Sequence, residues 1–199
     1  MPLLWLGVVL VTVAYLSAAV PYGVIVARAR GIDLRKVGSG NIGATNAARA
    51  LGKKLGALVL LLDVLKGLGP VLAARLLLPP SDEGALWLGG AMVAGVAGHM
   101  FSIFLGLRGG KGVATGLGVI LVASPWAGAA GIVLYVGIYA ATRISSLGSL
   151  AGTLCSPVVM YFTGSPLPVC GAALAIGILI VVKHHENIRR LIRREEGKV

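Results

Sequence analysis

Residues 166–182 read PLPVCGAALAIGILIVV, a run without a charged side chain that ends at the polar sequence KHHEN of residues 183–187. Similar apolar runs fill most of the chain, of which 57% is hydrophobic and only 13% charged, whereas soluble domains carry about 25% charged residues. The runs are apolar on every face, as in helices that cross hydrocarbon, and lack the alternating polarity of a membrane β-barrel. The sequence therefore predicts an all-α membrane protein.

The apolar runs predict a polytopic bundle of about seven transmembrane helices that forms one domain over residues 1–199. Their spans are 2–27, 55–78, 85–107, 113–124, 126–142, 147–163 and 166–182. The fourth is shorter than the roughly twenty residues that a spanning helix needs, so we expect it to be tilted or broken. Ser17-Ala18-Ala19 resembles a signal-peptide cleavage site, but no Lys or Arg precedes it. We therefore expect the first segment to be retained.

Basic residues are concentrated in alternate connections between these segments. The stretches 28–54, 108–112 and 183–198, together with Arg143, carry nearly all of the Lys and Arg, whereas the connections at 79–83, 124–125 and 163–166 carry none. Because basic loops stay in the cytoplasm, we expect an outside N-terminus and a cytoplasmic C-terminus. The net charge of +11 then follows from this bias and from attraction to anionic membrane lipids. We expect no binding to nucleic acid.

The first polar motif is GSGNIGATNAAR at residues 38–49. Its glycines let the backbone curl and aim successive N–H groups at one point, as in anion-binding loops. Arg49 adds a side chain that can bind two phosphate oxygens at once. A flexible polar loop is the alternative, but such loops do not normally combine these residues. We therefore predict a phosphate site made of Ser39, Gly40, Asn41, Gly43, Thr45, Asn46 and Arg49.

The second motif is GHMFSIFLGLRGGKGVAT at residues 98–115. Its RGGKG core combines a flexible backbone with a point charge, which predicts phosphate binding by Arg108, Gly109, Gly110 and Lys111. It is not a nucleotide P-loop, because a glycine follows the lysine and no strand precedes the motif. His99 lies in an apolar run. We predict that it binds substrate, with a hydrogen bond to a neighbouring helix as the alternative.

The third motif is KHHENIRRL at residues 183–191. On a continuing helix His184 and Asn187 share a face, and we predict that both have a functional rather than a structural role. The arginines that follow fit a solvated basic tail in contact with lipid head groups: Arg189, Arg190, Arg193 and Arg194. Three serines after Arg143 lie on the same expected side of the membrane, and we predict that they line the same pocket: Ser145, Ser146 and Ser149.

The remaining ionisable and thiol groups lie inside apolar segments. Asp63 and Lys66, at positions i and i+3, are expected to pair, either to pack helices or as part of the active site. Cys155 and Cys170 each stand alone, which predicts two buried thiols rather than a disulfide or metal site. Adjacent histidines point apart on a helix, and there is no acidic cluster, so we expect no metal and no other cofactor.

Together the motifs resemble those of the bacterial acyl-phosphate:glycerol-3-phosphate acyltransferases, the PlsY family: GSGN-x-GATN-x-x-R, GH-x-F-x-x-FLG-[F/L]-x-GGKG-x-AT and H-x-EN-I-x-RL followed by a glutamate. All three occur in order, with apolar segments throughout. The resemblance implies a multi-pass enzyme of the bacterial cytoplasmic (inner) membrane with its active site on the cytoplasmic face. It would transfer an acyl group from acyl phosphate to the 1-hydroxyl of glycerol 3-phosphate. The products would be lysophosphatidic acid and phosphate, in the first step of phospholipid synthesis.

The resemblance also implies roles for individual residues. Ser39, Gly40 and Asn41 would hold a phosphate, whereas the glycerol-3-phosphate and catalytic site would contain Arg49, Lys111, His184 and Asn187, with Glu196 as the later glutamate. The chain departs from the family pattern at Ser102, where proline is common, and at Arg194, where glycine is usual. No obligate protein partner is implied.

An acyl phosphate is already an activated anhydride, so no covalent acyl-enzyme is required, and the sequence has no Gly-x-Ser-x-Gly elbow. We expect positioning and charge stabilisation to dominate. The hydroxyl proton goes to His184 or to the substrate phosphate. We favour the phosphate, because no carboxylate clearly orients the histidine. The alternatives are a transporter for phosphorylated anions, although no internal repeat is visible, and a non-catalytic scaffold, which has little use for three polar motifs.

Overall fold

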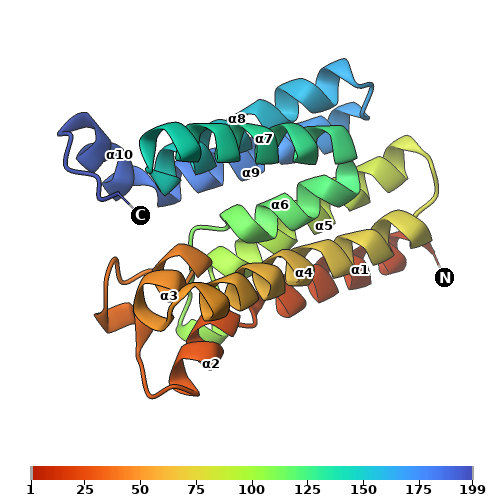
Figure 1. Ribbon diagram of the computed structural model, residues 1–199. Coiled ribbons are helices and arrows are strands. Elements are labelled where there is room, and N and C mark those ends of the chain that lie inside the picture. Colours follow the sequence, from red (N-terminus) through yellow and green to blue (C-terminus); the bar gives the residue numbers. More distant parts are fainter. Residues whose placement is uncertain (1, 199) are drawn as a thin grey trace.

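The computed structural model describes residues 2–198, which form helices joined by loops without any β-strand. The elements are α1 (Leu3–Ala19), α2 (Tyr22–Arg28), η1 (Leu34–Lys36), α3 (Ala44–Leu51), α4 (Lys53–Leu77), α5 (Asp82–Met100), η2 (Ile103–Leu105), α6 (Val113–Ala123), α7 (Pro125–Thr142), α8 (Ser145–Phe162), α9 (Leu167–Lys183) and α10 (His185–Ile192). Figure 1 shows α7, α8 and α9 as one layer, and α1, α4, α5 and α6 as the other. The short α2, α3 and α10 gather at one end.

Every apolar segment expected from the sequence coincides with a helix or a helix pair, but not all are long enough to span a membrane alone. Four helical stretches meet length and hydropathy requirements: Leu3–Arg28, Lys53–Leu77, Asp82–Leu105 and Pro125–Thr142. The pair Leu167–Lys183 and His185–Ile192, bent by 62°, would make a fifth, and Val113–Ala123 is a shorter apolar helix. The chain is therefore an all-helical multi-pass membrane protein, while the count of seven spans stays a prediction.

The two helices that fall short have local explanations. α6 ends at Ala123, where the Arg75 guanidinium donates hydrogen bonds to the carbonyls of Val122 and Ala123 and so satisfies the end of the helix. α8 carries hydroxyl side chains at positions that line a cavity, which lowers its hydropathy: Ser145, Ser146, Ser149, Thr153 and Ser156. The polarity of α8 thus reflects its position in the wall of this cavity.

Glycines bring the helices together where side chains would keep them apart. A Cβ on Gly118 would lie 2.1 Å from the carbonyl oxygen of Val64, and one on Gly67 would lie 2.4 Å from that of Thr115, so α4 and α6 pack backbone to backbone. Such contacts drive helix association in lipid, where apolar burial gives no advantage over lipid tails. Close backbone contact between helices thus adds to the packing of the apolar core.

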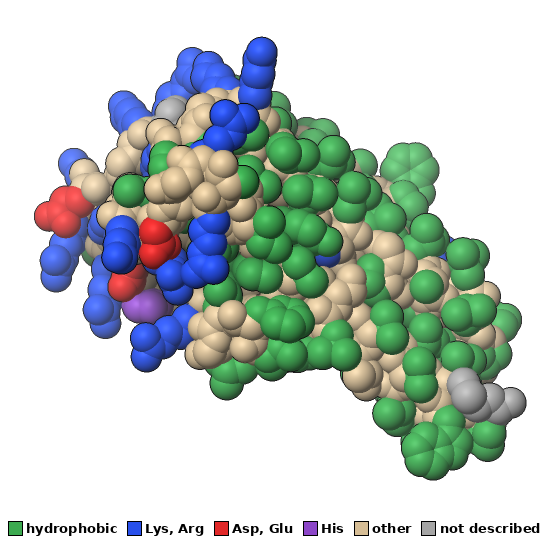
Figure 2. Space-filling model, turned by 90° about the horizontal axis from the view of Figure 1, so that it is seen from below, with side chains coloured by type: hydrophobic (Ala, Val, Ile, Leu, Met, Phe, Trp, Pro, Cys, Tyr) green, Lys and Arg blue, Asp and Glu red, His purple; other side chains and the backbone are tan. Residues whose placement is uncertain are grey.

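The outer surface is apolar over most of its area. Phe162 is 81% exposed and Trp126 74% exposed. Figure 2 shows hydrophobic side chains spread along the body of the visible face, whereas Lys and Arg gather at one end. An apolar surface of this extent suits lipid rather than water. Both predicted thiols are free, and Cys170 is buried as expected, whereas Cys155 is only half-buried.

Candidate active site

The three motifs meet around a cavity of about 860 Å³ at the end of the bundle that holds α3 and α10. Predicted site residues that line it are Ser39, Asn41, Gly43, Thr45, Asn46, Arg49, His99, Lys111, Ser146, Ser149, His184, Asn187 and Glu196. Its remaining wall comes largely from apolar side chains of α6, α7 and α9, among them Leu117, Ile120, Ile132, Val136, Ala173 and Ile176. One chamber therefore joins a polar and an apolar region.

The loop of the first motif is curled by two left-handed glycines. Gly38 has φ 57° and Gly40 has φ 68°, a region that glycine enters without a Cβ penalty. A Cβ on Gly38 would also lie 2.2 Å from Oδ1 of Asn46. Gly40 itself does not line the cavity, so its predicted contact with phosphate gains no support, and its contribution is to shape the loop.

Asn46 organises this loop from within. Its side chain is buried, with Nδ2 donating to the carbonyls of Leu34 at 3.1 Å, Val37 at 3.0 Å and Asn41 at 2.9 Å. Its Oδ1 accepts from the backbone N–H of Ser39 at 2.9 Å. Because these contacts engage both ends of the amide, we assign Asn46 to loop order rather than to the predicted substrate contact.

Three other residues of the motif offer unoccupied groups to the cavity. The side chains of Ser39, Asn41 and Arg49 line it, and none of them has a hydrogen-bond or ion-pair partner among residues 2–198. Thr45 is engaged instead, because its hydroxyl lies 3.3 Å from that of Ser145. The first motif thus presents one cation and two neutral polar groups that are available to an anion.

A chain of hydrogen bonds links the second and third motifs through the C-terminal tail. Nζ of Lys111 donates to Oδ1 of Asn187, and Nδ2 of Asn187 donates to Glu196 at 2.5 Å. Glu196 also accepts from Ser146 at 2.7 Å and from Arg190 at 2.6 Å. Because a carboxylate only accepts here, it fixes the Asn187 amide with its nitrogen toward Glu196 and its oxygen toward Lys111.

Electrostatics make the polar end of the cavity receptive to anions. Burial lowers the pKa of Lys111, and the nearby Arg190 lowers it further, while Glu196 opposes the shift. Burial raises the pKa of Glu196, but hydrogen bonds from Asn187, Arg190 and Ser146 outweigh it, and that pKa lies below its usual value. With Arg49 also lining the cavity, cations outnumber this one carboxylate at the polar end.

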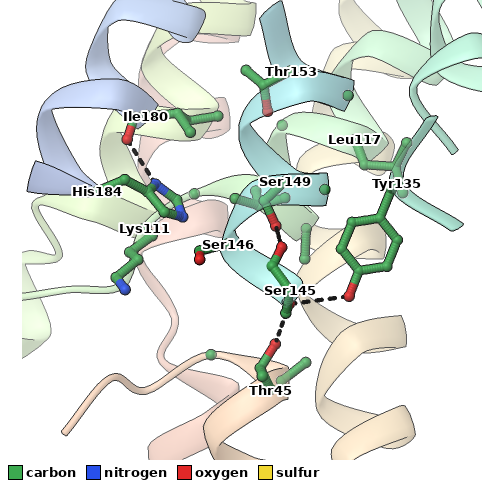
Figure 3. Close-up of a pocket in the computed structure, with 18 of the residues that line it drawn as sticks. Thr45, Lys111, Leu117, Tyr135, Ser145, Ser146, Ser149, Thr153, Ile180 and His184 are labelled. Carbon is green, nitrogen blue, oxygen red and sulfur yellow. Dashed lines mark hydrogen bonds between the residues drawn. The ribbon is translucent and has the colours of Figure 1, made fainter. Parts of the chain in front are cut away.

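His184 is held by the backbone rather than by a carboxylate. Its Nδ1 lies 2.8 Å from the carbonyl oxygen of Ile180, and since a carbonyl only accepts, Nδ1 carries the proton and Nε2 is left as an acceptor. Figure 3 shows the ring above Lys111, across from the α8 serines. The expected continuous helix is wrong, because α9 ends at Lys183 and α10 begins at His185 after a 62° bend.

The RGGK part of the second motif behaves differently from a phosphate loop. The N–H groups of Gly109 and Gly110 donate to the carbonyls of Met100 at 3.0 Å and His99 at 3.2 Å, so they complete the end of α5. A Cβ on Gly110 would lie 2.2 Å from Nε2 of His99. Neither glycine lines the cavity, and Arg108 lies in a separate cleft. Their predicted substrate contacts therefore gain no support, and only Lys111 reaches the cavity.

A buried charged group lies deeper in the same wall. Lys66 and Asp63 form the expected pair, with Nζ 2.8 Å from Oδ1, and Nζ also donates to the carbonyl of Val20 at 2.8 Å. Nδ1 of His99 lies 3.8 Å from the same Asp63 oxygen and has no hydrogen-bond partner in the described structure. Asp63 and His99 both line the cavity, whereas Lys66 does not, so only the carboxylate of the predicted pair belongs to the cavity wall.

α8 supplies hydroxyl groups to the opposite wall. Ser145 lies 3.1 Å from the hydroxyl of Tyr135, and Ser149 donates to the Ser145 carbonyl at 2.9 Å, as Figure 3 shows. The polar cavity residues that sequence reasoning missed include Tyr135, which lies in an apolar run, and Arg190, which the pattern assigns to a lipid-facing tail. Arg190 could have been found, because it follows Asn187 by three residues on the same helix.

Comparison with known proteins identifies the family of this chain. Residues 8–194 match the family model for glycerol-3-phosphate acyltransferase. A glycerol-3-phosphate acyltransferase of Anaeromyxobacter dehalogenans is 52% identical over 196 residues, which cover 98% of each chain. A crystal structure of PlsY, an integral membrane glycerol 3-phosphate acyltransferase in its glycerol 3-phosphate form, superposes with a TM-score of 0.91 at 41% identity, covering 97% of this chain and 95% of that chain. Its lysophosphatidic acid form gives 0.88 at 39% identity, covering 96% and 94%. The chain therefore belongs to the glycerol-3-phosphate acyltransferase family of integral membrane enzymes.

Proposed function

We propose that this enzyme transfers a fatty acyl group from acyl phosphate to the 1-hydroxyl of glycerol 3-phosphate. The products are lysophosphatidic acid and phosphate, in the first step of phospholipid synthesis. The observation that carries this proposal is the two-part cavity, which joins cationic side chains to an apolar chamber between α6, α7, α8 and α9. An acyl phosphate has the same two parts, so its head and chain both find matching surroundings.

In this proposal the two phosphate groups are held by different motifs. Arg49 and Lys111 hold the phosphate of glycerol 3-phosphate, the first as a planar fork and the second as a point charge. Ser39 and Asn41, on the curled glycine loop, receive the head of the acyl phosphate and stabilise negative charge as phosphate leaves. The reacting groups are thereby brought together without a covalent intermediate.

The chemical step is a direct acyl transfer. The hydroxyl oxygen of glycerol 3-phosphate bonds to the acyl carbon, the bond from that carbon to the phosphate oxygen breaks, and phosphate leaves with the electron pair. Nε2 of His184 accepts a hydrogen bond from this hydroxyl. The Ile180 carbonyl supports that hydrogen bond, because it fixes the orientation of the imidazole ring through Nδ1. The proton ends on His184 or on the substrate phosphate, whose second pKa is about 6. Near-normal kcat in His184→Ala would assign it to the phosphate.

The proposal also places the site in the cell. We propose a single domain with seven membrane crossings in the bacterial inner membrane, an outside N-terminus and a cytoplasmic cavity mouth. The basic end of the bundle supports this orientation. Single cysteines at Ser81 and Arg193, in a chain without Cys155 and Cys170, test it in right-side-out vesicles. An impermeant thiol reagent should label only the cysteine at position 81. Labelling of the cysteine at position 193 alone would show that the orientation is the opposite of the one proposed.

A turnover assay tests the function itself. The purified protein in detergent receives acyl phosphate and glycerol 3-phosphate, and release of inorganic phosphate is followed. Lys111→Met should lose most turnover, whereas Lys54→Met, a matched change at an exposed lysine outside the cavity, should keep it. Phosphorylated solute uptake into liposomes without any turnover would favour a transporter, and wild-type kcat/KM in Lys111→Met would refute our assignment of that lysine.

A further inference from the structure

A second cleft, of about 570 Å³, opens between two loops beside the active site. One wall comes from the loop around η1 and the other from the loop that follows η2; the lining residues are Asp33, Arg35, Lys36, Leu105, Gly106 and Arg108. None of these residues lines the larger cavity. Arg108 belongs to the second motif, yet the proposed acyl transfer does not use it. The cleft therefore requires its own explanation.

The cleft holds more positive charge than its own residues neutralise. Both carboxylate oxygens of Asp33 accept from Arg35, at 3.0 Å each, and that hydrogen bonding lowers the pKa of Asp33 to about 2. Lys36 and Arg108 are exposed, and neither has a hydrogen-bond or ion-pair partner among residues 2–198. Two unpaired cations from loops far apart in sequence thus face one hollow, which favours an anion between them.

Apolar side chains flank the same cleft. Phe104 is 58% exposed and Leu107 56% exposed, and both adjoin residues that line the cleft. Leu107 has φ 64°, an uncommon conformation for a large side chain, next to Gly106 with φ 59°. An exposed phenylalanine and leucine beside unpaired cations suit the boundary between lipid tails and head groups, where apolar and basic side chains serve as anchors. A free anion such as inorganic phosphate has no apolar part that could contact these two side chains.

From this juxtaposition we propose that the cleft binds the phosphate head group of an anionic membrane lipid. Lys36 and Arg108 contact the phosphate, while Phe104 and Leu107 lie against the upper part of the acyl chains. The site is separate from the acyl-transfer cavity and does not depend on the proposed reaction. Inorganic phosphate shares the charged part of this chemistry but lacks the apolar part, so the two ligands are distinguishable.

Native mass spectrometry of the purified protein in detergent, titrated with phosphatidylglycerol and separately with phosphatidylcholine, tests the proposal. Lys36→Gln/Arg108→Gln should weaken phosphatidylglycerol binding by about tenfold or more, because each basic residue near a lipid surface contributes appreciably. Phe104→Ala should also weaken it. The matched control Arg189→Gln/Arg193→Gln removes equal charge from exposed positions outside the cleft and should weaken phosphatidylglycerol binding far less.

A charge-preserving variant, Lys36→Arg/Arg108→Lys, separates loss of charge from loss of fold and should retain phosphatidylglycerol binding at wild-type melting temperature. Equal weakening in the Arg189/Arg193 control would overturn the proposal, because it would show only general attraction. Equal binding of phosphatidylcholine would do the same. A third outcome would also refute the proposal: millimolar inorganic phosphate displaces the lipid, and Phe104→Ala has no effect on lipid binding. That result would show that the ligand of the cleft is a free anion and not a lipid.

Discussion

Replacing Glu196 by Gln removes one negative charge from the C-terminal tail and keeps the side chain's size. The carboxylate accepts from Asn187 at 2.5 Å, Arg190 at 2.6 Å and Ser146 at 2.7 Å. An amide offers only one oxygen, so its NH₂ group must face at least one of these donors. Whichever way the amide turns, its NH₂ group faces a donor, either Arg190 at the Oε2 position or Asn187 and Ser146 at the Oε1 position. We therefore expect the Glu196→Gln variant to weaken docking of the tail, which would loosen the hold on the Asn187 amide that is fixed toward Lys111.

The size of the effect follows from the bonds that are lost. Hydrogen bonds to charged groups contribute about 1.5–3 kcal/mol each. The Arg190 side chain is 38% exposed, so solvent screens that ion pair and we count it at no more than about 1 kcal/mol. A loss of about 2–3 kcal/mol in tail docking would lower kcat/KM by about 30- to 160-fold, if transition-state binding requires the docked arrangement.

Phosphate release by the purified variants measures this loss, with Glu195→Gln as the matched control at the exposed neighbouring carboxylate. Because the pKa of Glu196 is lowered, its contribution is present above the ordinary carboxyl pKa and is lost as pH falls through the folded value. The gap between wild type and Glu196→Gln should therefore be full at pH 7 and narrow in acid. Wild-type kcat/KM in Glu196→Gln at pH 7 would refute the reasoning.

Three further changes follow from the same contacts. Arg49→Ala should raise KM for glycerol 3-phosphate and lower kcat/KM by about a hundredfold, if its guanidinium binds phosphate; an unchanged KM would remove it from that role. Gly110→Ala should lower the melting temperature in detergent, because its Cβ would lie 2.2 Å from Nε2 of His99, an overpacking of about 1–3 kcal/mol; unchanged stability would contradict the packing. Lys66→Met should destabilise by about 3–5 kcal/mol by leaving Asp63 unpaired, and Asp63→Leu/Lys66→Met by less; equal losses would show that the unpaired charge is not the cause.

The sequence predicts the residues of the site better than the reasons for their placement. His184 and Asn187 do share the cavity, yet they do so across a helix break and not on one helical face. Asp63 and Lys66 pair as their spacing predicts, because an i, i+3 contact is local to one helix. Such short-range relations can be inferred from the chain alone, since they depend on helix geometry only.

Long-range placement could not be inferred in the same way. Gly109 and Gly110 have the composition of an anion loop, but the acceptors for their N–H groups are carbonyls at the end of α5. Which way a loop's N–H groups point depends on what packs against them, and periodicity carries no information about that. Arg190 is a mixed case: its place beside Asn187 follows from the i, i+3 spacing on α10, but its carboxylate partner lies on a tail whose return to the cavity no local pattern indicates.

These contacts divide the active site into a fixed half and an open half. Lys111 is anchored by neighbours tied to α5, and its amine bonds Asn187, which Glu196 holds in turn. Arg49 and Ser39 of the first motif line the same cavity with side chains that no described residue engages.

Backbone groups within the bilayer must be satisfied by the protein itself, so a loop with free bonding groups is tolerated only at the end of the bundle. It follows that substrate binding should order the first motif and leave the Lys111 side nearly unchanged. Slower amide exchange on adding glycerol 3-phosphate should therefore appear in residues 38–49 and not in residues 109–111.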